Sequence, residues 1–371
     1  MTPPPPRHVF MTADAVGGVW TYACDLVREL AQAGVRTTLA VLGPGPNAAQ
    51  KRTALAAPAV RIVETGLPLD WLVSDPDSLT AAGRRLSIMA SESCADLVHL
   101  NSPILAAGVR FEQPLVGACH SCLATWWDAV RGGPLPHDFA WKTEVLARGY
   151  AACDALIAPS FSFMQATAAR YGLVPQVVRN GRAGQPERPA TARQPLVFAS
   201  GRFWDEAKNI RALDAAAARM RRGKVHAAGP LAYAHATAPT LQAVRPLGPL
   251  SAEGVAEWLG RATVFASLAL YEPFGLGVLE AAQAGCALVL SDIPTHRELW
   301  EGSAVFVNPG DPGAVAAVLD DLLAEADEAA RLGALARNRS NALTAAAMAE
   351  GTLTLYGKLL ARHPTLREAA A

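Results

Sequence analysis

The segment from residue 271 to residue 281 carries two glutamates, Glu272 and Glu280, on either side of a turn that contains proline and glycine. Because proline and glycine disfavour a regular helix, a helix is expected to begin only at about Leu276. The first backbone N–H groups of a helix have no partner within it and favour an anion. Glu280, about one turn into the helix, is suited to accept hydrogen bonds from a polyol. The segment therefore predicts a site for a nucleotide-sugar.

Two cationic side chains follow an expected strand at residues 196–199. Arg202 lies just beyond the strand, and Lys208 follows six residues later at the start of an expected helix. A guanidinium fork and a lysine point charge together are able to hold a diphosphate. Alone, such a pair is most often solvated surface charge, so its weight comes from the glutamates that follow it in the chain.

A comparable device occurs near the N-terminus. An expected strand at residues 8–12 leads into Gly17 and Gly18, and a helical pattern follows. Glycines there let the backbone approach a ligand at the carboxyl end of a strand. The full dinucleotide fingerprint G-x-G-x-x-G is absent, and a glycine pair after a strand is most often only a turn.

Short apolar runs alternate with longer amphipathic segments along the whole chain. Strands are expected at residues 8–12, 37–42, 97–100, 115–118, 156–158, 196–199, 224–227, 264–266, 287–290 and 305–307, with helices at residues 20–33, 140–152, 162–171, 210–222 and 251–261. Repeated alternation of strand and helix implies parallel sheets that are covered on both faces.

A polar, proline-rich stretch at residues 181–191 is typical of a linker. The sequence therefore predicts an α/β protein made of two Rossmann-like domains whose parallel sheets face a central cleft. The expected domains are an N-terminal domain at residues 1–185 and a C-terminal domain at residues 186–345, which holds the candidate nucleotide-sugar site. A helical tail at residues 346–371 is expected to pack back on the first domain.

Composition excludes several classes of protein. The 33 basic residues balance the 33 acidic ones, which argues against a nucleic-acid surface. No apolar run approaches the roughly 18 residues of a membrane-spanning helix, and the apolar run near the N-terminus is too short for a secretory signal. The six cysteines are dispersed, as in reduced cytoplasmic proteins. A soluble, cytoplasmic protein is expected.

Neither candidate for a metal site has adequate ligands. Cys119 and Cys122 form a close pair, but a zinc site would need a second ligand pair at matched spacing. Asp75 and Asp77 form the only D-x-D, in a stretch interpreted as a loop, and we interpret it as a turn. The sequence therefore predicts no metal and no cofactor.

Taken together, these motifs resemble the retaining GT-B glycosyltransferases of the glycosyltransferase family 4 type, also described as glycosyl transferases group 1. The resemblance covers nearly the whole length. Its motifs are Val16-Gly17-Gly18, Val98-His99-Leu100-Asn101, His120, Ala158-Pro159-Ser160, Asn180-Gly181, Ala199-Ser200-Gly201-Arg202, Asp205-Glu206-Ala207-Lys208-Asn209, Ala227-Ala228-Gly229-Pro230, Leu247-Gly248, Tyr271-Glu272-Pro273-Phe274-Gly275, Leu279-Glu280-Ala281 and Ala284-Gly285.

The resemblance implies a role for each site residue. Arg202 and Lys208 would hold the donor diphosphate and stabilise the leaving nucleotide. Glu280 would bond the ribose hydroxyls, and Glu272 those of the transferred sugar. The remaining donor contacts would come from backbone at Phe274, Gly275 and Leu276, and from Gly17 and Gly18 of the other domain.

His120 matches the histidine of such enzymes that touches the transferred sugar near the reaction centre. Here Ser121 and Cys122 follow it in place of the more usual acidic residue, so its acid–base partner is not apparent. A lone histidine after an apolar strand is otherwise more often structural.

The resemblance implies that the N-terminal domain, residues 1–185, binds the acceptor, and aromatic residues in the loop expected after His120 are candidate contacts. Trp126 and Trp127 follow His120, and tryptophan stacks well on sugar rings and flat acceptors, although core packing is the commoner role. Asp128 and Arg131 are further candidate acceptor contacts.

The expected activity is metal-independent, same-face transfer of a hexose from a nucleoside diphosphate sugar, a UDP-sugar by base rate, to a hydroxyl group. The acceptor is a small molecule, a glycan or a lipid-linked compound, with weak peripheral membrane contact left open. Two alternatives remain: an epimerase or hydrolase of nucleotide-sugars, and a non-catalytic binding subunit. A binding subunit would be expected to lack one of the two cations or two glutamates, and all four are present.

Overall fold

The computed structural model describes residues 5–184, 193–233 and 238–363. Contacts divide the chain into two compact units: unit 1, with residues 1–128, 132–181 and 345–371, and unit 2, with residues 129–131 and 182–344. The chain thus passes to unit 2 after Gly181 and returns to unit 1 at Ala345. The predicted domain boundary between residues 185 and 186 and the end of the predicted tail lie outside the described residues.

Unit 1 is built on a seven-stranded sheet in the order β3-β2-β1-β4-β5-β6-β7, in which every described strand pair is parallel. Its strands are β1 (His8–Asp14), β2 (Arg36–Leu42), β3 (Val60–Glu64), β4 (Leu97–Leu100), β5 (Leu115–Ala118), β6 (Ala155–Ala158) and β7 (Gln176–Val177).

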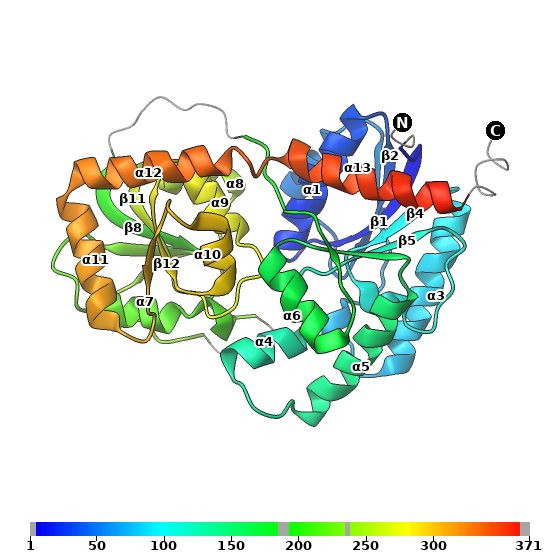
Figure 1. The fold of residues 1–371 in the computed structure, drawn as a ribbon, viewed down its shortest axis with the longest axis horizontal. Coiled ribbons are helices and arrows are strands. Elements are labelled where there is room, and N and C mark those ends of the chain that lie inside the picture. The colour runs from blue at the N-terminus through cyan, green and yellow to red at the C-terminus, as the bar shows by residue number, and fades with distance from the viewer. Residues whose placement is uncertain (1–4, 185–192, 234–237, 364–371) are drawn as a thin grey trace. The chain divides into compact units, whose positions relative to one another are not determined.

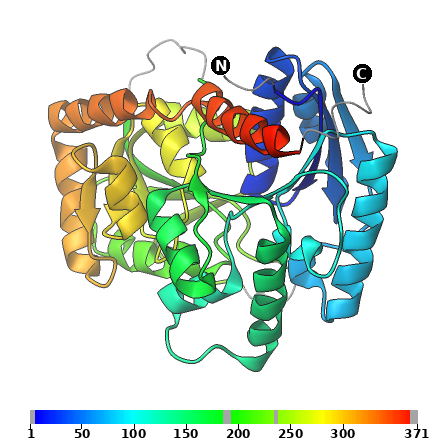
Figure 2. The ribbon, with the colours of Figure 1, turned by 45° about the vertical axis from the view of Figure 1, so that its right-hand side comes forward.

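Helices cover both faces of this sheet. They are α1 (Gly18–Gln32), α2 (Ala48–Leu55), α3 (Pro76–Glu92), α4 (Leu123–Val130), α5 (His137–Ala152), α6 (Phe161–Tyr171) and α13 (Ala345–Arg362), with short 3-10 turns η1 (Asp70–Leu72) and η2 (Pro103–Ala106). Alternate residues of β1 enter different cores: Val9 and Met11 pack with α1 and α13, and Phe10 packs with α3. Figure 1 and Figure 2 both show α13 running beside α1.

Unit 2 repeats this plan with six strands in the order β10-β9-β8-β11-β12-β13, again all parallel. The strands are β8 (Gln194–Ser200), β9 (Val225–Ala228), β10 (Arg245–Gly248), β11 (Ala262–Ser267), β12 (Ala287–Ser291) and β13 (Val305–Val307). The helices are η3 (Glu206–Lys208), α7 (Ile210–Ala217), α8 (Ala252–Arg261), α9 (Leu276–Gln283), α10 (Pro294–Trp300), α11 (Pro312–Ala324) and α12 (Ala326–Ser340). Alternation recurs in β8, where Val197 and Phe198 enter separate cores.

Each of the two sheets has its own topological switch point, at the equivalent place in the strand order. In unit 1 the first strand, β1, lies between β2 and β4, and in unit 2 the first strand, β8, lies between β9 and β11. Sheets of this order bind ligands at the carboxyl ends of the strands beside the switch point. The predicted fold of two Rossmann-like domains with parallel sheets is therefore confirmed, and the candidate residues can be examined at those edges.

Every predicted strand is present within two residues of its expected bounds. Three strands were missed: β3, β7 and β10. Each of them is an edge strand of its sheet, and each lacks a long apolar run. The helix predicted at residues 210–222 was too long, because α7 ends at Ala217. Beyond it, the buried carboxylate of Asp320 accepts backbone N–H bonds from Arg221 and Arg222 and holds a non-helical turn.

Two segments interpreted as loops are helical. Asp75 does not lie in a simple turn, since its side chain accepts a hydrogen bond from the Ser78 backbone N–H at 2.8 Å and caps α3. Pro76, the first residue of α3, provides the backbone angle that a helix start needs. The expected loop after His120 is largely α4, which includes Trp126, Trp127 and Asp128.

Among the described residues, no helix combines the length and the apolar character that a membrane crossing requires.

Candidate functional site

The loop after β8 is held against the end of β9 by close backbone contact. Gly201 donates its N–H to the carbonyl oxygen of Ala228 at 3.1 Å. A Cβ atom on Gly229 would lie only 1.8 Å from the Gly201 oxygen, and Gly229 has a φ of +141°. Only glycine is compatible with both constraints. This contact fixes the backbone from which Arg202 projects.

Helix α9 begins directly beside the same loop. Its N-cap is Gly275, with a φ of +91°, and no side chain caps the helix. A Cβ atom on Gly277 would lie 3.0 Å from the Ser200 Oγ at the end of β8. The predicted helix start at about Leu276 is confirmed, and the first amides of α9 lie at the carboxyl edge of the sheet, where they favour an anion.

Lys208 and Glu272 form an ion pair at this edge, with Nζ and Oε2 2.5 Å apart. Both side chains are largely buried, with 19% and 14% of their surfaces exposed. The Lys208 segment is anchored on both sides: the Leu270 N–H donates to the Ala207 oxygen at 2.8 Å, and Asn209 Nδ2 donates to the Leu268 oxygen at 3.1 Å. Lys208 and Glu272, which belong to separate sequence motifs, are therefore in direct contact in the folded protein.

The charge of Glu272 is set by its neighbours. Burial alone would raise the pKa of Glu272, but the charge and hydrogen bond of Lys208, followed by His296 and Arg202, bring that pKa below its usual value. Glu272 is therefore a carboxylate at neutral pH. The Arg202 guanidinium lies 5.5 Å from the Trp204 ring centroid, and Trp204 stacks on Tyr233.

Glu280 lies one turn into α9 and already has a cationic partner. Its Oε1 is 3.1 Å from the Arg182 guanidinium, and about a fifth of each side chain is exposed. Arg182 in turn donates its backbone N–H to the Leu343 oxygen at 3.2 Å. Sequence reasoning missed Arg182, because the contact joins positions about 100 residues apart and no local motif announces it.

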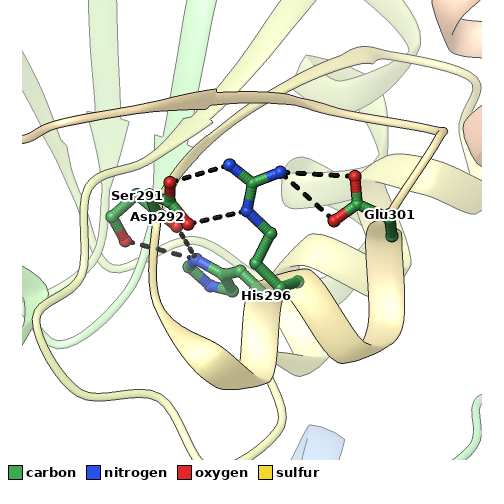
Figure 3. A network of polar contacts seen from close by, with 5 residues as sticks. Ser291, Asp292, His296 and Glu301 are labelled. Carbon is green, nitrogen blue, oxygen red and sulfur yellow. Dashed lines mark hydrogen bonds and ion pairs between the residues drawn. The ribbon is translucent and has the colours of Figure 1, made fainter.

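His296 is a second residue that sequence reasoning missed. It lies in α10 and is fully buried, and its Nδ1 approaches the Ser291 carbonyl oxygen at 2.9 Å and the Ser291 Oγ at 3.2 Å. Figure 3 shows the ring beside Ser291, with Asp292 and Glu301 at the neighbouring ion-pair cluster. Its only signal in the sequence was its position shortly after strand β12.

In unit 1, Gly17 and Gly18 lie at the carboxyl end of β1. Gly17 is the N-cap of α1 in an extended conformation, and Gly18 is the first helical residue. Asp14 accepts the Val16 backbone N–H at 2.9 Å, which shapes the turn before them. The structure thus places both glycines at the switch point of their own sheet.

His120 follows β5 at the same edge of unit 1. Its Nε2 lies 2.8 Å from Asn101 Oδ1, while Asn101 Nδ2 donates to the Thr12 oxygen at 2.6 Å. Since the amide nitrogen of Asn101 is used for Thr12, its oxygen must accept, so His120 donates from Nε2 and carries its lone pair on Nδ1. Burial lowers the pKa of His120 to about 4. The partner that the sequence did not reveal is therefore an amide, and the imidazole is neutral.

Other neutral polar groups surround His120. The Tyr22 ring meets it edge-on with centroids 4.6 Å apart. His99, in β4, is fully buried, and its Nδ1 lies 2.6 Å from the Tyr356 hydroxyl of α13. Burial, followed by the neighbouring His120, lowers the pKa of His99 to about 3. The groups around His120 at this edge of unit 1 are therefore uncharged hydrogen-bonding groups, and the Asp14 side chain lies at the end of β1.

The predicted acceptor residues lie on and just after α4. Trp127 packs edge-on against Phe139 at 5.7 Å, with Trp126 tilted 6.5 Å from it. The Arg131 guanidinium pairs with Glu206 at 2.6 Å, and half of each side chain is exposed. Asp128 is the next α4 residue after this aromatic pair.

Within residues 5–184, 193–233 and 238–363, no three histidine, cysteine, aspartate or glutamate side chains gather into a group that could hold a metal ion.

Two Rossmann-like domains of this strand order define the GT-B class of fold, and each half of the chain matches a glycosyltransferase family. Residues 16–182 match Glycosyltransferase Family 4, and residues 194–325 match Glycosyl transferases group 1. These matches, one to each half, support a GT-B glycosyltransferase of family 4/group 1.

A curated relative gives the same indication over part of the chain. The phosphatidyl-myo-inositol mannosyltransferase of Propionibacterium freudenreichii subsp. shermanii is 29% identical over 215 residues, which cover 53% of this chain and 52% of the relative. The chain thus spans about half the length of the curated relative it matches.

Solved structures share the fold at low sequence identity. Sucrose-phosphate synthase from Thermosynechococcus elongatus has a TM-score of 0.77 at 19% identity, over 96% of this chain and all of that one. Anabaena HepE in complex with UDP-glucose has a TM-score of 0.74 at 16% identity, over 96% and 99%. The glycosyltransferase WaaG, involved in lipopolysaccharide biosynthesis, has 0.69 at 13%, over 94% and 99%.

Proposed function

We propose that the protein transfers a hexose from a nucleoside diphosphate sugar to a hydroxyl acceptor, with retention of anomeric configuration. The observation that carries the proposal is the carboxyl edge of unit 2. There the Lys208–Glu272 pair, the Arg202 loop and the uncapped start of α9 converge at the switch point of one sheet. The cations and backbone amides are able to bind the negative charge of a diphosphate, and the carboxylates are able to accept hydrogen bonds from hydroxyl groups.

Catalysis follows from where charge develops. When a glycosyl–phosphate bond breaks, negative charge grows on the departing diphosphate, so fixed cations stabilise the transition state more than the ground state. Arg202 and Lys208 would provide that charge without a metal ion. Glu272 would hold hydroxyl groups of the sugar, and Glu280, with Arg182 beside it, those of the ribose.

Neutral His120 would serve the transferred sugar through hydrogen bonding. With its proton fixed on Nε2 by Asn101, its Nδ1 lone pair is able to accept a hydrogen bond from a sugar hydroxyl. In the proposed same-face displacement, the donor's own phosphate oxygen takes the acceptor proton, so no carboxylate beside His120 is required.

The donor is proposed to be a UDP-sugar, and a GDP-hexose is the principal competitor. Anabaena HepE was solved with UDP-glucose, whereas the curated relative is named as a mannosyltransferase that acts on phosphatidyl-myo-inositol. The latter name makes a polyol or lipid-linked polyol a reasonable acceptor to include in a screen.

The test is a screen of UDP- and GDP-hexoses read by nucleotide release, with and without pooled polyol, glycan and lipid-linked acceptors. We expect acceptor-dependent release from one nucleotide class, abolished in Lys208→Ala and unchanged in Lys224→Ala, an exposed lysine of the same unit. Release that does not depend on acceptor would indicate a hydrolase instead, and conversion of the donor to another nucleotide-sugar without nucleotide release would indicate an epimerase. NMR of the product showing inverted configuration would refute retention.

A further inference from the structure

His296 has a ring nitrogen that nothing in the described structure satisfies. The Ser291 carbonyl oxygen is able only to accept, so the proton of the neutral ring resides on Nδ1, 2.9 Å away. The Ser291 hydroxyl donates to the Ala269 oxygen, which leaves it free to accept from the same Nδ1. Nε2 therefore carries a lone pair, is buried and has no hydrogen-bond partner. An unpartnered buried acceptor lowers the stability of the folded protein, so its presence calls for a functional explanation.

The charged groups that act on this ring are the two members of the ion pair. Glu272 favours its protonated form and Lys208 opposes it, while burial lowers the pKa of His296 below its usual value. The Ser291 carbonyl also favours the protonated ring. Arg297, next to it on α10, directs its guanidinium to Asp292 and Glu301. Figure 3 labels both of these acidic residues.

This balance changes when a diphosphate arrives. The incoming phosphates attract Lys208, so Glu272 loses part of its compensating charge while new negative charge enters a largely buried site. Both changes favour a positive charge on the neighbouring ring. Nε2 is the one ring atom able to receive a proton, and that proton comes from solvent.

We propose that His296 is a positioning residue of the donor site that takes up a proton at Nε2 when a nucleoside diphosphate binds, and so keeps Glu272 charge-compensated while Lys208 serves the phosphates. This inference rests on the proposed function, since it needs the donor at this edge of unit 2. It assigns a use to the orphaned nitrogen and a reason for a buried histidine beside a buried ion pair.

The test compares UDP and GDP binding by calorimetry in buffers of different ionisation enthalpy, for wild type, His296→Gln and His137→Gln. Gln removes titration and retains a polar end near Nε2, and His137 is a fully exposed control. We expect proton uptake in wild type and His137→Gln that exceeds that of His296→Gln. Between pH 6 and pH 8 the wild-type Kd should rise about threefold more than that of His296→Gln, because binding that takes up a proton weakens as pH rises. The terminal phosphate of the nucleotide titrates equally in all three proteins.

Imidazole NMR of the wild type gives a readout that does not depend on a variant folding. The His296 Nε2 signal should change from the unprotonated to the protonated type on addition of saturating nucleotide. Nucleotide binding without this change, or with equal proton uptake in His296→Gln, would overturn the inference and leave the proposed function standing. Failure of wild type to bind either nucleotide would overturn both.

Discussion

The carboxyl edges of the two sheets have the same topology and opposite chemistry. In unit 2 the edge carries ionised partners, Lys208 with Glu272 and Arg182 with Glu280. In unit 1 the groups around His120 are imidazole, phenol and amide, and burial keeps His99 and His120 uncharged at neutral pH, while Asp14 at the end of β1 is the acidic side chain described there. The same strand order thus supports two chemical environments, and the side chains on the edge loops determine whether an edge carries ion pairs or buried neutral groups.

The difference fits a division of labour in the proposed reaction. The unit with fixed cations suits the diphosphate, where charge develops, and the unit with neutral groups suits hydroxyl groups, which need hydrogen bonds. Four experiments would break or sharpen this comparison, and they are given from the largest expected effect to the smallest.

Removal of a cation from the charged edge should have the largest effect. Lys208→Ala should lower kcat by about 100-fold, as for the loss of one transition-state donor. Steady-state kinetics with saturating donor would measure it, with Lys224→Ala as the matched control. A loss below threefold would remove Lys208 from the phosphate site.

Neutralisation of Glu280 should act on binding. Glu280→Gln should raise the nucleotide Kd about tenfold, since a hydrogen bond to a charged group contributes about 1.5 kcal/mol, with little change in kcat. Calorimetry and steady-state kinetics on the same preparation would separate the two. An effect on kcat alone would reassign Glu280 to the chemical step.

Truncation at α4 should affect the acceptor only. Trp127→Ala should raise the acceptor KM about fivefold, in line with about 1 kcal/mol for an aromatic contact, and leave the donor KM unchanged. Equal changes in both KM values would return Trp127 to a structural role, which its packing on Phe139 also permits.

The two buried neutral histidines of unit 1, His99 and His120, should make the protein less stable at acid pH. The pKa values of His99 and His120 in the folded protein, about 3 and about 4, lie below the usual 6.5. Protonation therefore favours the unfolded state, and Tm should fall as pH decreases from about 6.5 to 5. His120→Gln should flatten that decrease in a thermal melt. An unchanged slope in both His120→Gln and His99→Gln would show that folding does not lower the pKa of these rings.

The sequence predicted the features that depend on local patterns. Buried parallel strands are continuous apolar runs, so β1, β8 and β11 were found, whereas the shorter or more polar β3, β7 and β10 were not. Gly275 and the start of α9 followed from the conformational limits of glycine and proline. The α4 residues were placed in a loop because helix formation there depends on packing, such as Trp127 on Phe139, that no local signal reports.

The candidate site was predicted as a set of residues but not as a set of contacts. Arg202, Lys208, Glu272 and Glu280 followed from types, order and resemblance. The pairing of Lys208 with Glu272, the partner Arg182 and the unpartnered nitrogen of His296 all depend on tertiary contacts between distant positions. Periodicity and spacing carry no information about such contacts.

The central claim is that the charged edge of unit 2, and not the neutral edge of unit 1, receives the nucleoside diphosphate. A crystal structure of the protein soaked with UDP, and separately with GDP, tests it most directly. The account predicts the diphosphate against Arg202, Lys208 and the first amides of α9, with Glu280 toward the ribose. A nucleotide bound at the edge of unit 1 that holds Gly17 and His120, with Lys208 still paired to Glu272, would contradict it.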